Sequence, residues 1–124
     1  MLTGCSEESI VGSVIYKPDL VPVKTEAVDP PTNAIGEPVE PPRIIIRVRN
    51  AGDGTAHSAH AELRLKRGGT IIESANGSLP RLAPGDDAVT DITLFNVDSH
   101  DAYDAYDCTL IWLDARSRGY SRSC

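Results

Sequence analysis

The segment from Arg43 to Ala56 constrains the fold of this chain more than any other, because an alternating strand pattern there runs into a glycine-rich turn. Apolar and basic side chains occupy opposite faces of the strand. The apolar face holds Ile44, Ile46 and Val48, and the basic face holds Arg43, Arg47 and Arg49. A period of two predicts a strand that buries one face in a sheet.

The size and charge of the chain narrow its class. With 124 residues it is long enough for one hydrophobic core and too short for two. The net charge is −6 and the isoelectric point is about 4.9, with the basic residues scattered along the chain. This pattern argues against nucleic acid or an anionic membrane surface as a partner. Without a run of about 18 apolar residues, contact with a membrane would need a lipid anchor.

Short strand patterns recur along the rest of the chain and alternate with turn signals. They cover 19–28, 43–50, 59–66, 70–75, 88–95, 106–114 and 119–124. They predict an all-β fold, an immunoglobulin-like Greek-key β-sandwich of about seven strands in two antiparallel sheets. We expect the sandwich to occupy residues 18–124, after a tether at residues 1–17.

Proline, glycine and asparagine place several of these strands. Pro22 lacks a donor for the ladder and predicts that 19–28 lies at a sheet edge. Five prolines within 29–42 predict an extended crossover between the sheets. Asn76-Gly77 predicts a turn that closes the strand 70–75. Asn50 and Gly52 predict unusual backbone dihedrals where the chain leaves the strand 43–50. The strand 106–114 is apolar on both faces, so we place it inside a sheet.

Four short motifs occur in order along residues 18–113. They are Pro18-Asp19-Leu20-Val21, Gly36-Glu37-Pro38-Val39, Val48-Arg49-Asn50-Ala51-Gly52 with Ala56, and Leu82-Ala83-Pro84-Gly85. Together they resemble CARDB, the cell-adhesion-related, immunoglobulin-like domain found in bacterial exported proteins. The resemblance implies a sandwich domain that is not an enzyme and that usually belongs to a larger surface protein. The end of this chain departs from the family, since it lacks an acidic, asparagine-rich closing strand.

The N-terminus carries a candidate lipidation motif. Leu2-Thr3-Gly4-Cys5 resembles the bacterial lipobox, in which the cysteine is lipidated and becomes the new N-terminus. Only Met1 precedes the motif, whereas a secretory leader needs about 7 to 15 apolar residues. We expect lipidation of Cys5 and a place in the bacterial cell envelope, in the periplasm or at the cell surface. The alternative is a chance tetrapeptide.

The two other cysteines, Cys108 and Cys124, fall opposite each other in a predicted hairpin. A three-residue loop around Arg116 would pair Trp112 with Tyr120 and the two cysteines with one another. A disulfide there would stabilise the domain by about 3 kcal/mol on the chain-entropy model. It would also indicate an oxidising compartment. The alternative is two unpaired thiols, because connectivity cannot be determined from sequence alone.

Candidate metal ligands are few. His57 and His60 are three residues apart, which in a regular strand places them on opposite faces and argues against a shared metal. An acidic stretch around His100 could offer carboxylates to calcium, but no glycine marks a calcium loop. The stretch contains Asp98, Asp101, Asp104 and Asp107. We favour a solvated connection with one helical turn and expect no cofactor.

The function that these patterns favour is binding without catalysis, since neither a Gly-x-Ser-x-Gly elbow nor a convergent triad is recognisable. We expect an exported module that recognises a protein or glycan of the cell envelope through sheet edges and end loops. The end-loop residues are Asn50, Gly52, Asp53, His57, Asp98, His100 and Asp101. Two alternatives stay open: a structural or accessory subunit of an envelope complex, and a small hydrolase or metal-dependent protein that uses the histidines and nearby aspartates.

Overall fold

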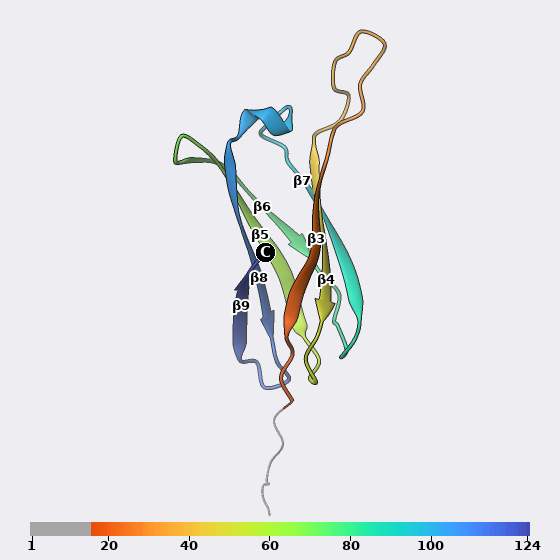
Figure 1. Cartoon of the computed structure of the whole chain (residues 1–124), viewed down its shortest axis with the longest axis vertical. Helices are drawn as coiled ribbons and strands as arrows, with labels where there is room; N and C mark the ends of the chain where they lie inside the picture. The colour runs from red at the N-terminus through yellow and green to blue at the C-terminus, as the bar shows by residue number, and fades with distance from the viewer. Residues whose placement is uncertain (1–15) are drawn as a thin grey trace, which may run out of the picture.

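The computed structural model describes residues 16–124, which form seven strands and one short 3₁₀ turn (Figure 1). The strands are β3 (Leu20–Val28), β4 (Arg43–Asn50), β5 (His57–Arg67), β6 (Thr70–Ser78), β7 (Asp87–Thr93), β8 (Ala105–Leu113) and β9 (Gly119–Ser123). The turn η1 (His100–Ala102) lies between β7 and β8. The predicted lipidation site Cys5 and most of the predicted tether lie outside the described residues.

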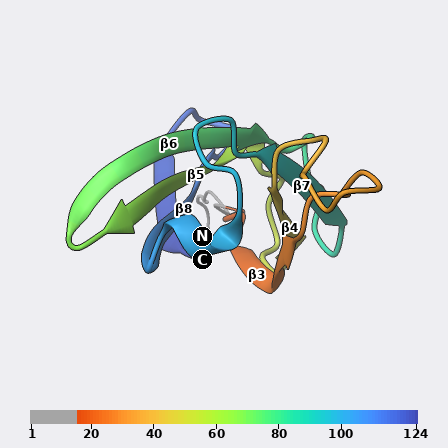
Figure 2. The same cartoon turned by 90° about the horizontal axis from the view of Figure 1, so that it is seen from above.

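The strands form two antiparallel sheets that face each other, as the view from above shows (Figure 2). One sheet has the order β3-β4-β7 and the other has the order β6-β5-β8-β9. The chain changes sheet between β4 and β5, between β6 and β7, and between β7 and β8, which is a Greek-key path. The predicted all-β sandwich of two antiparallel sheets is confirmed.

The core lies between the two sheets and uses the faces that the alternation predicts. From β4 it contains Ile44, Ile46 and Val48, and from β5 it contains Ala61, Leu63 and Leu65. β3 is an edge strand with a bulge between Pro22 and Lys24, as the proline predicts. β8 lies inside its sheet, between β5 and β9, and buries Leu110 and Trp112.

The proline-rich segment between β3 and β4 is a hairpin arm and not the predicted crossover between sheets. β3 and β4 are neighbours in one sheet, with Val28 opposite Arg43, so the chain returns directly to the adjacent strand. A bridge between Thr32 and Pro38 closes the projecting segment. Prolines lack the N–H donors that a long ladder of backbone hydrogen bonds between two strands needs. They still permit a short hairpin in which the turn residues form the few backbone hydrogen bonds. We call residues 29–42 the arm.

The prediction of a turn at Asn76-Gly77 is also wrong, because both residues lie within β6. Gly77 is buried and lies opposite Ala61 of β5. A Cβ atom at Gly77 would overlap the side chains of Thr90 and Ile92 on β7. The glycine therefore permits the close approach of the two sheets and does not reverse the chain.

β8 and β9 form the predicted hairpin, with Trp112 opposite Tyr120. The predicted disulfide between Cys108 and Cys124 is present, with the two Cα atoms 5.0 Å apart. Because disulfides persist outside the reducing cytosol, this bond indicates an oxidising, extracytoplasmic location. Within residues 16–124, no helix has the length and apolar character needed to cross a membrane.

Candidate functional site

The residues predicted to bind a partner divide between the two ends of the sandwich (Figure 1). Asn50 lies opposite Leu20 at the start of β3, whereas His100 contacts Val28 at the other end of the same strand. We call these ends the Asn50 end and the arm end. The Asn50 end contains Asn50, Gly52, Asp53 and His57, and the arm end contains Asp98, His100 and Asp101. The seven residues therefore do not form one site.

Asn50 is fully buried and connects three segments of the Asn50 end. Its Oδ1 accepts hydrogen bonds from the backbone N–H groups of Asp19 at 3.1 Å and Gly52 at 3.0 Å. Its Nδ2 donates to the carbonyl oxygens of Gly54 at 2.8 Å and Leu82 at 2.9 Å. All four hydrogen-bonding positions of the side-chain amide are occupied. The side chain of Asn50 thus serves the fold and is closed to a ligand.

The two glycines after Asn50 permit close packing of the segment that leads into β3. A Cβ atom at Gly52 would overlap the backbone of Lys17, and a Cβ atom at Gly54 would overlap the backbone of Tyr16. Asn50 and the two glycines all lack a φ in the left-handed region, so the prediction of unusual dihedrals at Asn50 and Gly52 is wrong. The loop instead packs closely against the segment that precedes β3.

His57 and His60 lie on the same face of β5, contrary to the prediction from their spacing. A β-bulge lies between them, where Ser58 has a positive φ of 51°. As a result His57 is opposite Leu113 and His60 is opposite Ile111, and these two partners share one face of β8. Neither a proline nor a glycine marks this bulge in the sequence.

An open hollow of about 520 Å³ lies beside His57 at the Asn50 end. The residues that line it include Tyr16, Asp53, His57, Arg81 and Pro84. Asp53 is already engaged, because its Oδ1 accepts a hydrogen bond from the backbone N–H of Lys17 at 2.8 Å. The remaining polar groups of the lining can stack on a ligand or hydrogen-bond to it.

Asp114 fixes the β8–β9 turn at the same end. Its Oδ1 accepts hydrogen bonds from the backbone N–H groups of Arg116 at 2.8 Å and Arg118 at 3.0 Å. Its Oδ2 accepts from Arg118 Nε and from Tyr120 Oη, each at 3.0 Å. Burial raises the pKa of this carboxyl, but these four hydrogen bonds outweigh burial and lower the pKa to about 2. Burial, with the hydrogen bond to Asp114, raises the pKa of Tyr120.

The arm is a hydrogen-bonded hairpin that carries apolar side chains into solvent. Asn33 organises its tip, since Oδ1 accepts from the backbone N–H groups of Ile35 at 3.1 Å and Glu37 at 2.9 Å. The N–H of Val39 donates to the carbonyl oxygen of Pro31 at 2.9 Å. On this framework Ile35 is 78 % exposed, and Val39 is exposed as well.

A buried carboxylate holds the loop after β7. Glu73 on β6 is only 5 % exposed, and it points inward. Its Oε2 accepts from the backbone N–H of Phe95 at 2.8 Å, and its Oε1 accepts from that of Asn96 at 3.1 Å. The loop so held presents Phe95, the one phenylalanine of the chain, 77 % exposed. Nothing in the sequence distinguishes Glu73, because a lone glutamate in a strand resembles any outward-facing residue.

His100 ties η1 to the end of β3. Its Nε2 lies 2.9 Å from the carbonyl oxygen of Val28, and its Nδ1 lies 2.6 Å from Tyr103 Oη. A carbonyl oxygen can only accept, so Nε2 donates to Val28, while Nδ1 is paired with the Tyr103 hydroxyl. Burial, followed by the neighbouring Tyr106, raises the pKa of Tyr103. Both ring nitrogens of His100 are therefore engaged within the protein.

The acidic stretch contains the predicted helical turn, which is η1, and two of its aspartates have partners on the β5–β6 hairpin. Asp104 Oδ2 accepts from the backbone N–H of Gly68 at 3.0 Å, and Asp107 Oδ2 lies 2.7 Å from Lys66 Nζ. In the part of the chain from residue 16 onward, no cluster of three or more His, Cys, Asp or Glu side chains could hold a metal ion. Through these two contacts the acidic stretch is held against the β5–β6 hairpin.

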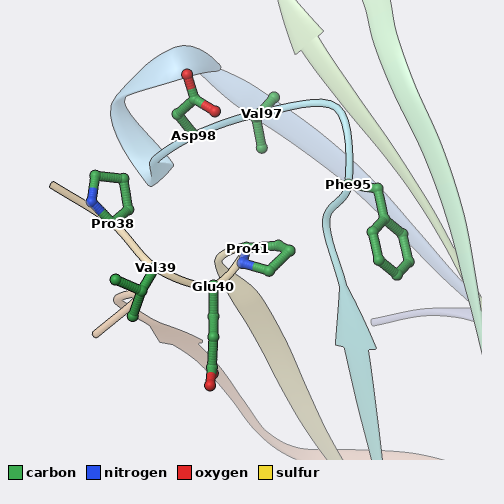
Figure 3. Close-up of a pocket in the computed structure, with 7 residues that line it drawn as sticks. All are labelled: Pro38, Val39, Glu40, Pro41, Phe95, Val97 and Asp98. Atoms are coloured by element: carbon green, nitrogen blue, oxygen red, sulfur yellow. The ribbon is translucent and has the colours of Figure 1, made fainter. Parts of the chain in front are cut away.

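A hollow of about 200 Å³ separates the arm from the loop after β7 (Figure 3). It is lined by Pro38, Val39, Glu40, Pro41, Phe95, Val97 and Asp98. In Figure 3 the ring of Phe95 turns away from the arm, so the exposed side chains of Phe95 and Val39 stand apart rather than in one patch. The arm end thus offers several separate apolar contact points around a hollow.

The arm end is acidic. The arm contains three acidic residues and neither lysine nor arginine, and the same holds for the segment 94–104. The nearby Arg67 is engaged, since its guanidinium donates to the carbonyl oxygen of Asp101 at 3.0 Å. Apolar side chains in acidic surroundings are complementary to an apolar surface with a basic rim.

The structure establishes a two-sheet β-sandwich with one disulfide. No protein-family model matches the chain, and no curated protein matches its sequence. Of what the CARDB resemblance implies, the structure shows the β-sandwich of two antiparallel sheets.

Proposed function

We propose that the chain is a non-catalytic binding module of the bacterial cell envelope whose arm end recognises a protein partner. The observation that carries this proposal is the exposure of Ile35 and Phe95, at 78 % and 77 %, on a backbone held by Asn33 and Glu73. Full burial of such a side chain contributes about 1.5–3 kcal/mol. A framework that is already ordered loses little conformational entropy on binding. Exposed side chains of this kind suit the anchor role in an interface.

The partner surface should contain apolar pockets with basic residues around them. Glu40 and Asp98 line the hollow together with Val39 and Phe95, and Glu37 lies at the tip of the arm. Opposite charges across an interface raise the association rate and exclude wrong partners. A glycan is the alternative ligand, and it would fit better at the Asn50 end. There the exposed Tyr16 and Arg81 line the larger hollow.

The proposed location combines the disulfide with the N-terminal motif. The disulfide supports an extracytoplasmic position, and Leu2-Thr3-Gly4-Cys5 supports a lipid anchor on Cys5. The described chain begins at the Asn50 end, where Lys17 bonds Asp53, whereas the arm lies at the opposite end (Figure 1). An anchor on Cys5 would thus leave the arm at the end far from the membrane. The CARDB resemblance agrees with a role in adhesion.

Site-specific photo-crosslinking in the bacterium that encodes the chain tests the protein partner. A photoreactive amino acid is placed at position 35 or 95, and the crosslinked protein is identified by mass spectrometry. Position 23 is the matched control, because Val23 is an exposed apolar residue, 55 % exposed, on the edge strand β3. The identified partner is then produced and titrated against the purified chain. Ile35→Ser and Phe95→Ser should each weaken binding by about tenfold or more, and Val23→Ser should not.

The outcomes separate the alternatives. The same partner at positions 35 and 95, absent at position 23, supports the proposal. Equal crosslinking at all three positions overturns it, as does a partner whose affinity is unchanged by both serine variants. Binding to a glycan array that Arg81→Ala abolishes and Ile35→Ser preserves would favour the glycan alternative.

Two simpler measurements address the remaining alternatives. Cys5→Ser should move the chain from the membrane fraction to the soluble envelope fraction, and an unchanged distribution would contradict the lipid anchor. An accessory subunit without a ligand of its own would co-purify with its complex in fixed proportion, whatever residue stands at position 35. Hydrolysis of model esters or peptides that His57→Ala abolishes would favour the enzyme alternative.

A further inference from the structure

The edge of β6 has fewer of the features that shield the other sheet edges from pairing with a foreign strand. It has one bulge, at Ile72, and is regular from Glu73 to Ser78. β3 has the bulge at Pro22 and a lysine, both of which discourage strand addition. β7 carries Asp87 and Asp91 on its outer face, and β9 is only five residues long. β6 is nine residues long and contains neither proline, lysine nor arginine.

The side chains of β6 leave its edge uncharged. Its one ionisable residue, Glu73, is buried, and both carboxylate oxygens accept backbone hydrogen bonds from within the protein. Ser74 and Asn76 are exposed, together with Ile71 at 50 % and Ile72 at 37 %. β6 therefore presents a neutral, partly apolar row on a chain whose net charge is −6.

The backbone of this edge is also unpaired within the described part of the chain. β6 forms a ladder with β5 on one side only, and β7 belongs to the other sheet. In residues 16–124 no backbone hydrogen bond joins the free edge to another segment. A row of free N–H and C=O groups is a template for one more strand.

We propose that this edge pairs with β6 of a second copy, in antiparallel orientation, so that the two four-stranded sheets become one continuous sheet. The charge distribution favours a second copy, because two acidic molecules can meet along β6 without placing like charges opposite each other. A two-fold axis at Ser74 keeps the outward side chains of both copies on one face. It places Ser74 opposite Ser74, and Glu73 of each copy opposite Ala75 of the other, within the part of β6 that has a regular register.

The dimer should be weak. One pair of strands buries less than the area of about 1,200–2,000 Å² that is usual in a stable complex, so a Kd between about 10 µM and 1 mM is expected. This self-association does not depend on the function proposed for the arm end. It uses a different strand and leaves Ile35 and Phe95 free.

Sedimentation equilibrium of the full 124-residue chain, from about 10 µM to about 1 mM, tests the proposal. The average mass should rise with concentration from 13.3 kDa toward twice that value. Ser74→Lys brings like charges together and should raise the Kd at least tenfold, and Asn76→Lys provides a second test at another exposed position. Ser121→Lys is the matched control, because Ser121 is an exposed serine on the other edge of the same sheet.

A symmetric crosslink tests the register. In a Cys5→Ser background, Ser74→Cys should form an intermolecular disulfide on mild oxidation, and Ser121→Cys should not. A constant mass of 13.3 kDa at every concentration overturns the proposal. Equal effects of Ser74→Lys and Ser121→Lys also overturn it. Association that Ile35→Ser abolishes and Ser74→Lys preserves would assign self-association to the arm end instead. Circular dichroism of each lysine variant shows whether it is folded, and at least one folded variant of β6 is required for the comparison.

Discussion

Replacing Asn50 by alanine tests whether this side chain holds the Asn50 end together. The substitution removes four hydrogen bonds of 2.8 to 3.1 Å at a position with no exposure to solvent. Two backbone N–H groups and two carbonyl oxygens lose their partner, and the methyl group of alanine replaces none of them. The three segments that meet at Asn50 would then be joined by their backbone hydrogen bonds and by the Asp53 side chain, which accepts from the N–H of Lys17.

The magnitude follows from the number of bonds. A typical intramolecular hydrogen bond contributes about 0.5–1.5 kcal/mol, so four bonds correspond to about 2–6 kcal/mol. The nearby loops are at the surface and can relax to admit water, so we expect a loss of about 3–4 kcal/mol in the free energy of unfolding. The melting temperature should fall by about 10–20 °C for a domain of this size.

Urea denaturation provides the assay, with the fluorescence of the single tryptophan, Trp112, and circular dichroism as independent probes. Asn96→Ala is the matched control, because the Asn96 side chain is exposed and the change should stay within about 0.5 kcal/mol. Asn50→Asp keeps the acceptor but places an oxygen against two carbonyl oxygens, so it should destabilise at least as strongly. A loss below about 1 kcal/mol for Asn50→Ala would refute the account of Asn50.

Three further outcomes concern the carboxylates and the disulfide. The pKa of Asp114 is lowered in the folded state, so the ionised carboxylate stabilises the fold above the unfolded pKa of 3.8, and this stabilisation is lost as the pH falls toward about 2. Asp114→Asn should therefore flatten the pH dependence of the free energy of unfolding in that window, as measured by urea denaturation. Glu73→Ala should speed hydrogen exchange at the amides of Phe95 and Asn96, and unchanged exchange would contradict the anchoring role. Reducing the disulfide should lower the free energy of unfolding by about 3 kcal/mol in thermal melts. A loss smaller than about 1 kcal/mol would contradict a stabilising role for the Cys108–Cys124 bond.

The sequence predicted those parts of the structure that depend on local periodicity and on counting. The alternation in 43–50 identifies the buried face of β4, and counting outward from Arg116 places Cys108 opposite Cys124. Both inferences need only the period of a strand and the length of one turn. Local reasoning also places β3 at a sheet edge, because Pro22 has no N–H to donate to a neighbouring strand.

Predictions failed where a distant segment determines what a residue does. Gly77 and Gly52 resemble turn glycines, but each is needed because another part of the chain passes too close for a Cβ atom. Ser58 introduces a bulge that moves His57 and His60 to one face, and nothing beside it in the sequence indicates this. The prolines of the arm predict a crossover between sheets, which is wrong because the sequence alone does not show which strand the chain pairs with next.

The two ends of the sandwich differ in what their side chains stabilise, and this difference separates stability from binding. At the Asn50 end, Asn50 and Asp114 are buried, and their side chains are fully hydrogen-bonded to the surrounding backbone and side chains. At the arm end, Ile35 and Phe95 contribute little to folding, because they remain in solvent. Asn50→Ala should therefore lower the free energy of unfolding while each folded molecule keeps its affinity for the partner. Ile35→Ser should do the opposite, and a variant of either residue that changed both quantities together would show that the ends are coupled through the core.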